Sequence, residues 1–417
     1  MTVAHRTSPD RLVDALLPDG RRVDLTLRDG RIAAVDSHQP KALAPAENTL
    51  DCGGALVLPA FVDGHCHLDK TFLGAPWQPH RVADSLHERI GCEKVLRSQI
   101  EVPVTERATA LANRMVSLGT GHVRSHVDID LEAGLTGLHA LLEVRAALRD
   151  RISIQLVAFP QSGVVTAPGV EGLLDAALAE GADVIGGLDP AGFDGDVDGQ
   201  LDVVFGLADR HGAGVDIHLH DPGTLGTGQL RAIAERTRAL GLGGKVTVSH
   251  AYALGQVDGD EVDRTATALA AAGVAILTNG PAGTMPPVLR LRDHGVRVFA
   301  GSDNIRDAWW PYGTGDMLER ATIIGLEGGL MADDELGYTA SLITDSAAIV
   351  LGIDDYGLLP GCRADLVVVD AAGLPEAVAA HPPRLWVLLQ RARRRRNPRL
   401  DQRADRRRAA GSLHLLG

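Results

Sequence analysis

Residues 182–222 read ADVIGGLDPAGFDGDVDGQLDVVFGLADRHGAGVDIHLHDP, and this stretch decides the fold. It contains a short apolar run, a turn, a helical segment that ends at a glycine, and a second apolar run rich in β-branched residues. Apolar residues of the middle segment recur at three- and four-residue spacing, which is typical of an amphipathic helix. Two strands joined by a helix predict a βαβ unit with parallel strands.

The same rhythm continues in both directions, from about residue 55 to residue 305. Alanine- and leucine-rich helical segments separate eight runs with strand character, which span residues 55–67, 121–130, 152–160, 182–190, 214–222, 245–250, 273–280 and 297–304. Eight βα units over roughly 250 residues match the size of a closed (β/α)8 barrel, the TIM barrel. An open, doubly wound parallel sheet is the alternative.

The segments on either side of the barrel predict a small second domain. Residues 21–36, RRVDLTLRDGRIAAVD, are two alternating runs joined by Asp-Gly, which signals a hairpin. Residues 356–370, YGLLPGCRADLVVVD, give a turn and another strand. Because neither segment alone buries a core, we expect residues 1–58 and 355–390 to form a small β-sandwich domain beside a barrel of residues 59–354.

Residues 391–417 are expected to form an atypical tail. Ten Arg and only two Asp lie between residues 391 and 408, and the segment neither alternates nor follows the βα rhythm. A solvated end is the favoured interpretation, and an arm for nucleic acid or an acidic partner is the alternative.

Composition narrows the class of protein. The net charge is −13 although the tail is basic, so the rest of the surface is acidic and disfavours nucleic acid. Four cysteines without a CxxC pair predict neither a disulfide framework nor a thiolate metal site. The first 20 residues lack the apolar segment of a signal peptide, and no stretch approaches the ~20 apolar residues that span a bilayer. We therefore expect a cytoplasmic protein without a membrane partner.

Polar side chains gather where the predicted strands end, and in barrel enzymes this rim holds the active site. These residues are His65, His67, His126, Gln161, Asp189, His218, His220, His250 and Asp303.

Four of them predict a metal site. His65 and His67 are two residues apart at a strand end, so both side chains share one face and can converge on one ion. His218 and Asp303 follow the fifth and eighth strands and complete the set. Nitrogen and oxygen donors without thiolate suit Zn²⁺ or Fe²⁺ and leave positions open for water. We expect one ion, because a second would need a bridging group. In related barrels that group is a carboxylated lysine of the fourth strand, and the fourth strand here has no lysine.

Two residues are expected to handle protons. His250 ends the sixth strand and is a natural base, since imidazole titrates near neutrality. A further metal ligand or a structural histidine is the alternative for this residue. Asp303 can bind the ion through one oxygen and take a proton with the other.

Three side chains near the rim are candidates for substrate contact. Trp309 and Trp310 follow the eighth strand and could stack on a flat heterocycle, with packing of the following loop as an equal alternative. Lys70 lies just past the two histidines, where an ion pair with Asp69 is the default interpretation and substrate contact the alternative.

The motifs HCHLDKTF, RSHVDID, QLVAFPQSG, GGLDPA, DIHLHDPGTLG, VTVSHAY and GSDNIRDAWWPYGTGDM occur in this order. Together they resemble the amidohydrolase superfamily over about residues 10–370, specifically its cytosine deaminase-like branch. Within it they resemble most the enzymes that remove isopropylamine from N-isopropylammelide, a triazine. The resemblance implies a mononuclear zinc or iron hydrolase that attacks a ring carbon and expels ammonia or an alkylamine, and it implies a homo-oligomer.

The resemblance also assigns roles. It implies His65, His67, His218 and Asp303 as ligands, His250 as the catalytic histidine, and Gln161 as the contact to a ring carbonyl. Cytosine deaminase has a glutamate where this chain has Asp221, and Asp221 is therefore the expected catalytic acid. Cytosine deaminase also has a second aspartate where this chain has Asn304. Both departures agree with the ammelide-type relatives. His220 is expected to contact substrate and to supply the proton transfer or orient the site.

Two further functions stay open at this point. A mononuclear hydrolase could instead open a cyclic amide or lactam. A barrel without catalytic activity that serves as a scaffold is the third possibility, against which the complete ligand set argues.

Overall fold

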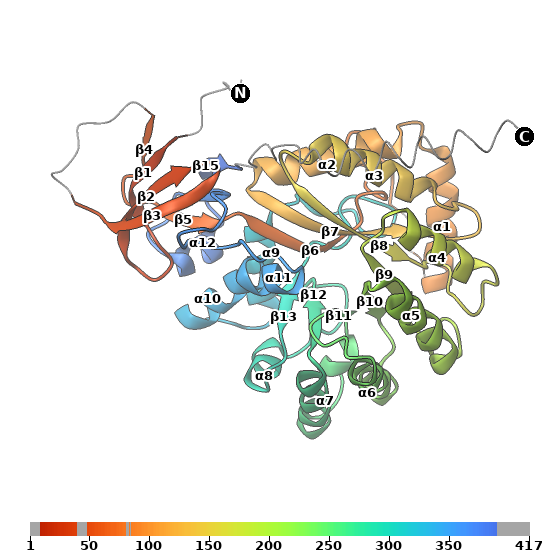
Figure 1. Cartoon of the computed structure of the whole chain (residues 1–417). Coiled ribbons are helices and arrows are strands. Elements are labelled where there is room, and N and C mark those ends of the chain that lie inside the picture. Colours follow the sequence, from red (N-terminus) through yellow and green to blue (C-terminus); the bar gives the residue numbers. More distant parts are fainter. Residues whose placement is uncertain (1–8, 40–47, 81–82, 84, 390–417) are drawn as a thin grey trace, which may run out of the picture.

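The computed structural model describes residues 9–39, 48–80, 83 and 85–389, and its centre is a barrel of eight parallel strands (Figure 1). Neighbouring strands follow the order of the sequence, from β6 to β13. Their bounds are β6 (Phe61–Cys66), β7 (Thr120–Asp128), β8 (Ser153–Phe159), β9 (Val184–Leu188), β10 (Gly214–Leu219), β11 (Val246–His250), β12 (Val274–Thr278) and β13 (Val298–Ala300). Each of the eight predicted runs coincides with one of them to within a few residues, and the predicted barrel is confirmed.

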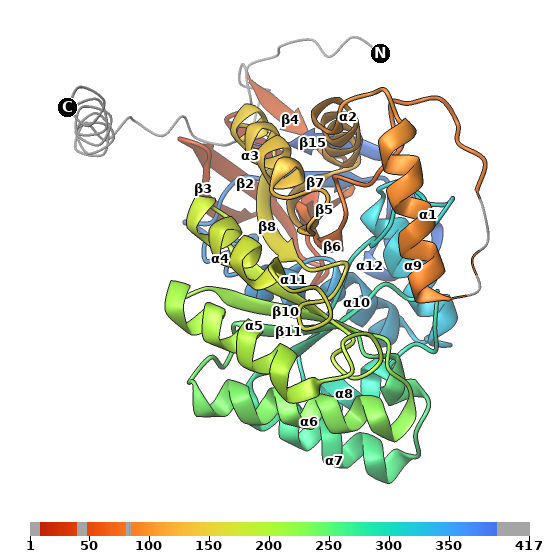
Figure 2. The same cartoon turned by 90° about the vertical axis from the view of Figure 1, so that its right-hand side faces the viewer.

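Most helices cover the outside of these strands (Figures 1 and 2). In chain order the helices are α1 (Leu86–Gln99), α2 (Val104–Ser117), α3 (Thr136–Leu148), α4 (Val170–Glu180), α5 (Val197–His211), α6 (Gly223–Ala239), the 3-10 turn η1 (Tyr252–Gly255), α7 (Gly259–Ala272), α8 (Val288–Asp293), α9 (Met317–Glu327), α10 (Asp333–Leu342), α11 (Asp345–Val350) and α12 (Leu374–Ala380). Of these, α1 and η1 lie at the cavity described below, and α12 packs against α9 and α10. Among the helices of the described residues, none has the length and apolarity needed to cross a membrane.

Helix α5, in the stretch quoted above, shows why the sequence folds this way. The Asp196 side chain accepts a hydrogen bond from the backbone N–H of Gly199 and caps the helix N-terminus. Gly212, in the left-handed region at φ 66°, ends the helix. The face that carries Leu201, Val204 and Phe205 is buried against the barrel, as the apolar spacing predicts.

The barrel closes where β13 meets β6, and this seam excludes the open-sheet alternative. Cys66 and Asp303 form a parallel bridge, and the backbone N–H of Asp303 donates to the His65 carbonyl over 2.7 Å. Two glycines allow this close approach. A Cβ on Gly64 would overlap Phe299, and a Cβ on Gly301 would lie 2.5–2.6 Å from backbone and Cβ atoms of His65.

Gly301→Ala is therefore expected to destabilise the protein and lower its thermal midpoint. Overpacking of this kind costs about 1–3 kcal/mol, because the seam must open to admit the methyl group. Gly206→Ala is the matched control: Gly206 lies in α5, where an added Cβ would meet no atom within 4 Å, so this change should be neutral or stabilising. Equal midpoints for the two variants would contradict the tight seam.

The N- and C-terminal segments meet in a separate mixed sheet, drawn at the left in Figure 1. Its strands are β1 (Arg11–Leu16), β2 (Arg22–Arg28), β3 (Arg31–Ser37), β4 (Thr49–Asp51), β5 (Leu56–Pro59), β14 (Leu366–Val369) and β15 (Arg384–Leu388). The order is β15-β14-β5-β1-β2-β3, and β4 pairs with β1. The predicted hairpin turns at Asp29 and Gly30, both with positive φ.

This small domain has its own core, which includes Leu12, Leu25, Val57 and Leu366. Strand β5 pairs with β14 and runs through Ala60 into β6, so the first barrel strand starts from the small domain. The expected union of the two terminal segments is thereby confirmed. The exact boundaries at residues 58 and 355 stay predictions, and the tail of residues 391–417 lies outside the described residues.

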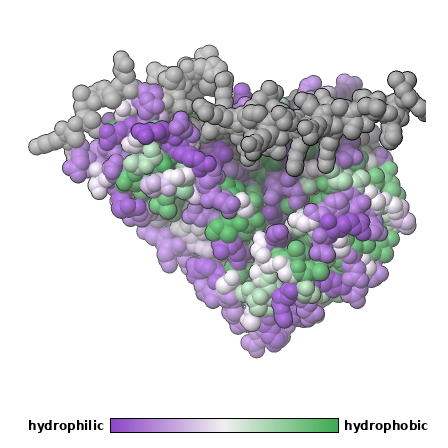
Figure 3. All heavy atoms as spheres, in the orientation of Figure 1, coloured by the Kyte–Doolittle hydropathy of each residue, from purple (hydrophilic) through white to green (hydrophobic). Residues whose placement is uncertain are grey.

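The face shown in Figure 3 is mainly hydrophilic, with hydrophobic residues in small groups.

Candidate metal centre and active site

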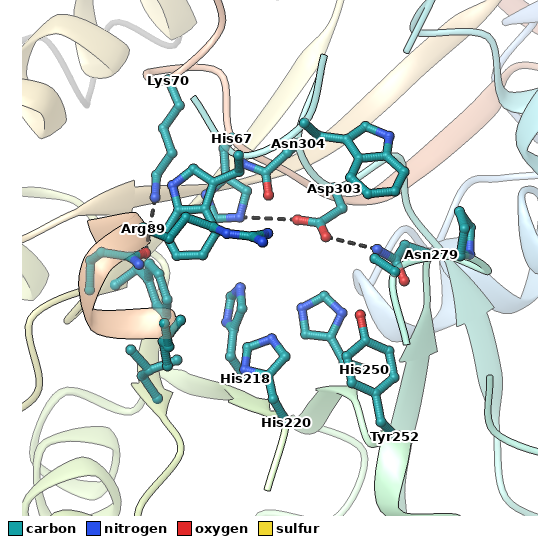
Figure 4. Close-up of a pocket in the computed structure, with 18 of the residues that line it drawn as sticks. His67, Lys70, Arg89, His218, His220, His250, Tyr252, Asn279, Asp303 and Asn304 are labelled. Atoms are coloured by element: carbon teal, nitrogen blue, oxygen red, sulfur yellow. Dashed lines mark hydrogen bonds and ion pairs between the residues drawn. The ribbon is translucent and has the colours of Figure 1, made fainter. Parts of the chain in front are cut away.

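Five histidines and one aspartate converge at the carboxyl ends of the barrel strands, and Figure 4 labels His67, His218, His250 and Asp303 among them. The ring of His65 is central: its centroid lies 4.0 Å from that of His126, 4.7 Å from that of His218 and 5.2 Å from that of His250. His67 follows at 5.3 Å. All five histidines are buried, so parallel strands with consecutive ends have brought distant residues into one cluster.

Asp303 faces this cluster with one carboxylate oxygen. Its Oδ1 lies 3.5 Å from His65 Nε2 and 3.3 Å from His67 Nε2, and its Oδ2 accepts a hydrogen bond of 2.8 Å from Asn279 Nδ2. The backbone of Asp303 is in the left-handed region, at φ 60°, which aims the side chain inward. Burial alone would raise the pKa of Asp303, but the neighbouring rings of His65, His67 and His250 hold it well below its usual range.

Several buried ring nitrogens have no hydrogen-bond partner within the described part of the chain. They are His65 Nε2, His67 Nδ1, His250 Nδ1 and both ring nitrogens of His126 and of His218. Burial lowers the pKa of His126, His218 and His250 well below the usual value, which keeps these rings neutral with free lone pairs. An unpaired buried polar atom costs about 1–3 kcal/mol, so such a cluster is typical of a ligand site.

Two overlapping groups could hold a metal ion. His65, His126 and His218 form one, and His65, His67 and Asp303 form the other, with ligand atoms within 4.8 Å of each other in each group. The donor set is nitrogen and carboxylate oxygen without thiolate, which fits a divalent ion with open positions. The four predicted ligands all lie in these groups, and His126 joins them as a residue that the sequence placed at the rim but not among the ligands.

A hydrogen-bonded chain below the cluster fixes how His65 presents itself. Arg124 Nη1 donates to Asp216 Oδ2 over 2.9 Å, and the Ser249 hydroxyl donates to Asp216 Oδ1 over 2.6 Å. A hydroxyl has one proton, so Ser249 can only accept at its 3.0 Å contact with His65 Nδ1. His65 Nδ1 therefore bears the hydrogen, and Nε2 turns its lone pair toward the cluster.

A cavity of about 390 Å³ opens above the cluster. Of the predicted site residues, those that line it are His67, Lys70, Gln161, His218, His220, His250, Asp303 and Trp309. His65 lies beneath them in contact with His67, His126 and His218. Trp310 also lines the cavity, and its ring centroid lies 5.6 Å from that of Tyr312, so its two expected roles both stay predictions.

His220 forms a polar pair with Asp189 at the cavity edge. Its Nδ1 lies 2.8 Å from Asp189 Oδ2, and its ring stacks on His250 at 4.7 Å. Burial by itself would lower the pKa of His220, but the Asp189 carboxylate outweighs it and raises that pKa above its usual value. His220 can therefore carry a proton into the cavity more readily than its neutral neighbours.

The structure does not bring Asp221 into the cavity. Its Oδ2 accepts hydrogen bonds from the Gly192 backbone N–H at 2.9 Å and from Gln229 Nε2 at 2.8 Å. These bonds turn the carboxylate toward the loop after β9. Of the two neighbours, His220 lines the cavity and Asp221 does not, and the catalytic role expected for Asp221 stays a prediction.

Lys70 lines the cavity, but its ammonium group is engaged by neighbours. Its Nζ lies 3.0 Å from Asp128 Oδ1 and 3.3 Å from Glu93 Oε2, and it donates to Gln161 Oε1 over 2.9 Å. The expected partner Asp69 instead accepts from the Asp128 backbone N–H. Glu93 also accepts from the indole N–H of Trp309 over 2.6 Å. Lys70 thus positions Gln161 and the wall that holds Trp309.

Sequence reasoning did not single out several residues that line the cavity, among them Asn279, Tyr252, Arg89 and Arg320. Asn279 and Tyr252 follow strands β12 and β11, so the strand-end criterion could have found them. Arg89 comes from α1 and packs over Trp309 at 5.7 Å, and Arg320 comes from α9 and donates to backbone carbonyls. Neither arginine lies near a strand end in the sequence, so that criterion could not point to them.

Comparisons with known proteins agree with this geometry. The family model of the amidohydrolase family matches residues 48–389 of this chain. The chain is 32% identical over 375 residues to N-isopropylammelide isopropyl amidohydrolase of Pseudomonas sp. strain ADP, covering 88% of this chain and 91% of that one.

Solved structures give the same result. N-isopropylammelide isopropylaminohydrolase of Burkholderia multivorans superposes with a TM-score of 0.87 at 42% identity, over 92% of this chain and 97% of that one. The 5-methylcytosine deaminase of Klebsiella pneumoniae with 5-fluorocytosine superposes with a TM-score of 0.82 at 29% identity, over 91% and 97%.

Proposed function

The chain belongs to the amidohydrolase family, and we propose that it hydrolyses a non-peptide C–N bond at a ring carbon of a pyrimidine- or triazine-like heterocycle, with release of ammonia or an alkylamine. This proposal rests mainly on one observation: histidine nitrogens without a hydrogen-bond partner in the described part of the chain lie with Asp303 at the floor of a cavity that aromatic side chains line. A cavity of about 390 Å³ suits one substituted ring. The comparisons support the ring chemistry.

We assign one divalent ion, Zn²⁺ or Fe²⁺, to His65, His67, His218 and Asp303. When bound, such an ion lowers the pKa of water toward ~7 and polarises the attacked group. His126 lies against this set, and its Nε2 is 3.7 Å from Asp216 Oδ2, a carboxylate outside the four predicted ligands. We therefore place His126 beside the ligand set as a supporting residue.

The remaining residues move protons. Asp303 offers a carboxylate of low pKa that is anchored by Asn279, so it can take a proton from the attacking water and return it. His250 is neutral and has a free Nδ1 within the described residues, which suits a base or hydrogen-bond partner for the same water. His220, held by Asp189, is placed to protonate the ring or the leaving amine.

The walls orient the ring. Gln161 is held by Lys70 through its oxygen, so its amide hydrogens are available to a ring carbonyl. Trp309, anchored by Glu93, can cover one face of a flat substrate.

The test is product release from purified protein with quantified metal. Cytosine, isocytosine, creatinine, ammelide and N-isopropylammelide are incubated separately, and mass spectrometry follows the ring product, the amine and ammonia. The proposal expects at least one compound to exchange its amino or alkylamino group for oxygen. Products that gain one water without losing an amine would instead identify a cyclic amide hydrolase. No reaction with any compound in a metal-loaded sample would overturn the proposed ring class.

Ser249→Ala is expected to weaken metal binding. The change removes the acceptor that holds the hydrogen of His65 on Nδ1, and loss of such an outer partner typically costs 10–100-fold in metal affinity. Competition with a chelator measures the affinity directly, and Ser249→Thr, which keeps the hydroxyl, should restore most of it. Unchanged affinity in the alanine variant would contradict the assigned orientation of His65.

A further inference from the structure

Three primary amides line the cavity, and two of them, Gln161 and Asn304, lie on different sides of the barrel mouth. Gln161 follows β8 and Asn304 follows β13. The orientation of a primary amide is set by its hydrogen-bond network, because its oxygen only accepts and its nitrogen only donates. In both residues a neighbour of fixed polarity decides which end is left for a ligand.

The neighbour of Gln161 is a cation. Lys70 Nζ has donors only and lies 2.9 Å from Gln161 Oε1, so the oxygen must face it. The ammonium group is itself held by Asp128 and Glu93, which are buried with it. Gln161 is therefore left with its N–H donors.

The neighbour of Asn304 is a carboxylate, and the polarity is opposite. Asn304 Nδ2 donates to Asp307 Oδ2 over 2.6 Å. Asp307 is buried, and its Oδ1 accepts from the backbone N–H groups of Trp309 and Trp310 at 2.8 and 3.0 Å. A turned amide would place two acceptor oxygens against each other. Asn304 is thus left with its oxygen, which lies on the cavity side in Figure 4.

We propose that Asn304 is a specificity-determining residue that accepts a hydrogen bond from a ring N–H, while Gln161 donates to a ring carbonyl. The site then selects rings that carry both groups, the cyclic ureides and lactam forms of oxo-pyrimidines and oxo-triazines. Rings with acceptors only leave the Asn304 oxygen unpaired in a desolvated site. This selection rests on the proposed function, because it names the class of ring that the same cavity takes.

Asp307 acts as the positioning residue of this arrangement. In Asp307→Asn, the remaining side-chain oxygen would still accept from the backbone N–H groups of Trp309 and Trp310. The new NH₂ group would therefore occupy the position of Oδ2. That NH₂ group donates to Asn304, whose amide must turn over and present N–H groups to the cavity. An isosteric change outside the cavity lining would therefore invert the polarity of one wall.

Calorimetric titration of the metal-loaded protein tests the proposal with two probes, uracil and 1,3-dimethyluracil, which has both carbonyls but no N–H. The parent protein should bind uracil at least about tenfold more tightly, since an unpaired buried polar group costs about 1–3 kcal/mol. Asn304→Ala should weaken the binding of uracil and leave the affinity for 1,3-dimethyluracil nearly unchanged. Asp307→Asn should reduce or reverse the preference.

A preference for uracil that survives in both variants would overturn the proposal, and so would a parent protein that binds neither probe or binds both equally. Metal content and the circular dichroism spectrum confirm that each variant is folded, and the isosteric Asp307→Asn variant keeps the test decisive if Asn304→Ala is unstable. Binding is measured without turnover. Failure of amine release therefore counts against the proposed reaction alone.

Discussion

Replacement of His250 by asparagine is expected to abolish turnover while the metal stays bound. The imidazole lines the cavity 5.0 Å from the ring of His218, and burial keeps it neutral and able to accept a proton. Asparagine retains polarity but cannot act as a base, and loss of a general base costs typically 10²–10⁴-fold. Release of amine or ammonia measures kcat/KM, and elemental analysis measures the metal.

The matched control for this substitution is His139→Asn. His139 lies on α3 at the exposed surface, where it pairs with Glu180, and it does not line the cavity. Its variant should keep full activity. A His250→Asn protein with activity close to that of the control would remove His250 from the mechanism, and loss of the ion would make it a ligand instead.

Removal of the metal is expected to lower the thermal midpoint by roughly 5–10 °C, because metal binding adds about 4 kcal/mol to the free energy of unfolding. Without an ion, the neutral nitrogens of His65 and His218 and their neighbours stay buried without partners. Differential scanning calorimetry before and after chelation measures the shift, and added Zn²⁺ should reverse it.

His218→Ala provides the second arm of this experiment. The variant should melt lower than the parent and show no further shift on chelation, because its site no longer retains the ion. The His139→Asn control should shift as the parent does. Equal midpoints for the parent protein with and without chelator would argue that the cluster holds no ion.

The sequence predicted most of the barrel and the floor of the site for one physical reason. Parallel strands end at a common rim, so His65, His218 and Asp303 had to meet if the strand pattern was right. Closure at Gly64 and Gly301 supplies the last contact, between His65 and Asp303, from opposite ends of the barrel sequence.

The walls of the site were harder to predict, because side-chain direction there depends on partners from other loops. Asp221 follows the rim motif, yet the Gly192 N–H and Gln229 hold it away from the cavity. Lys70 pairs with Glu93 and Asp128 and not with its sequence neighbour. No periodicity in the sequence encodes these choices. The expected homo-oligomer and the role of the tail stay predictions.

Elemental analysis of the purified protein tests the central claim most directly. The account predicts about one divalent ion, zinc or iron, for each chain, lost from His218→Ala and retained by His139→Asn. A protein that carries no ion after expression with adequate zinc and iron, or one whose ion survives replacement of His218, would contradict it.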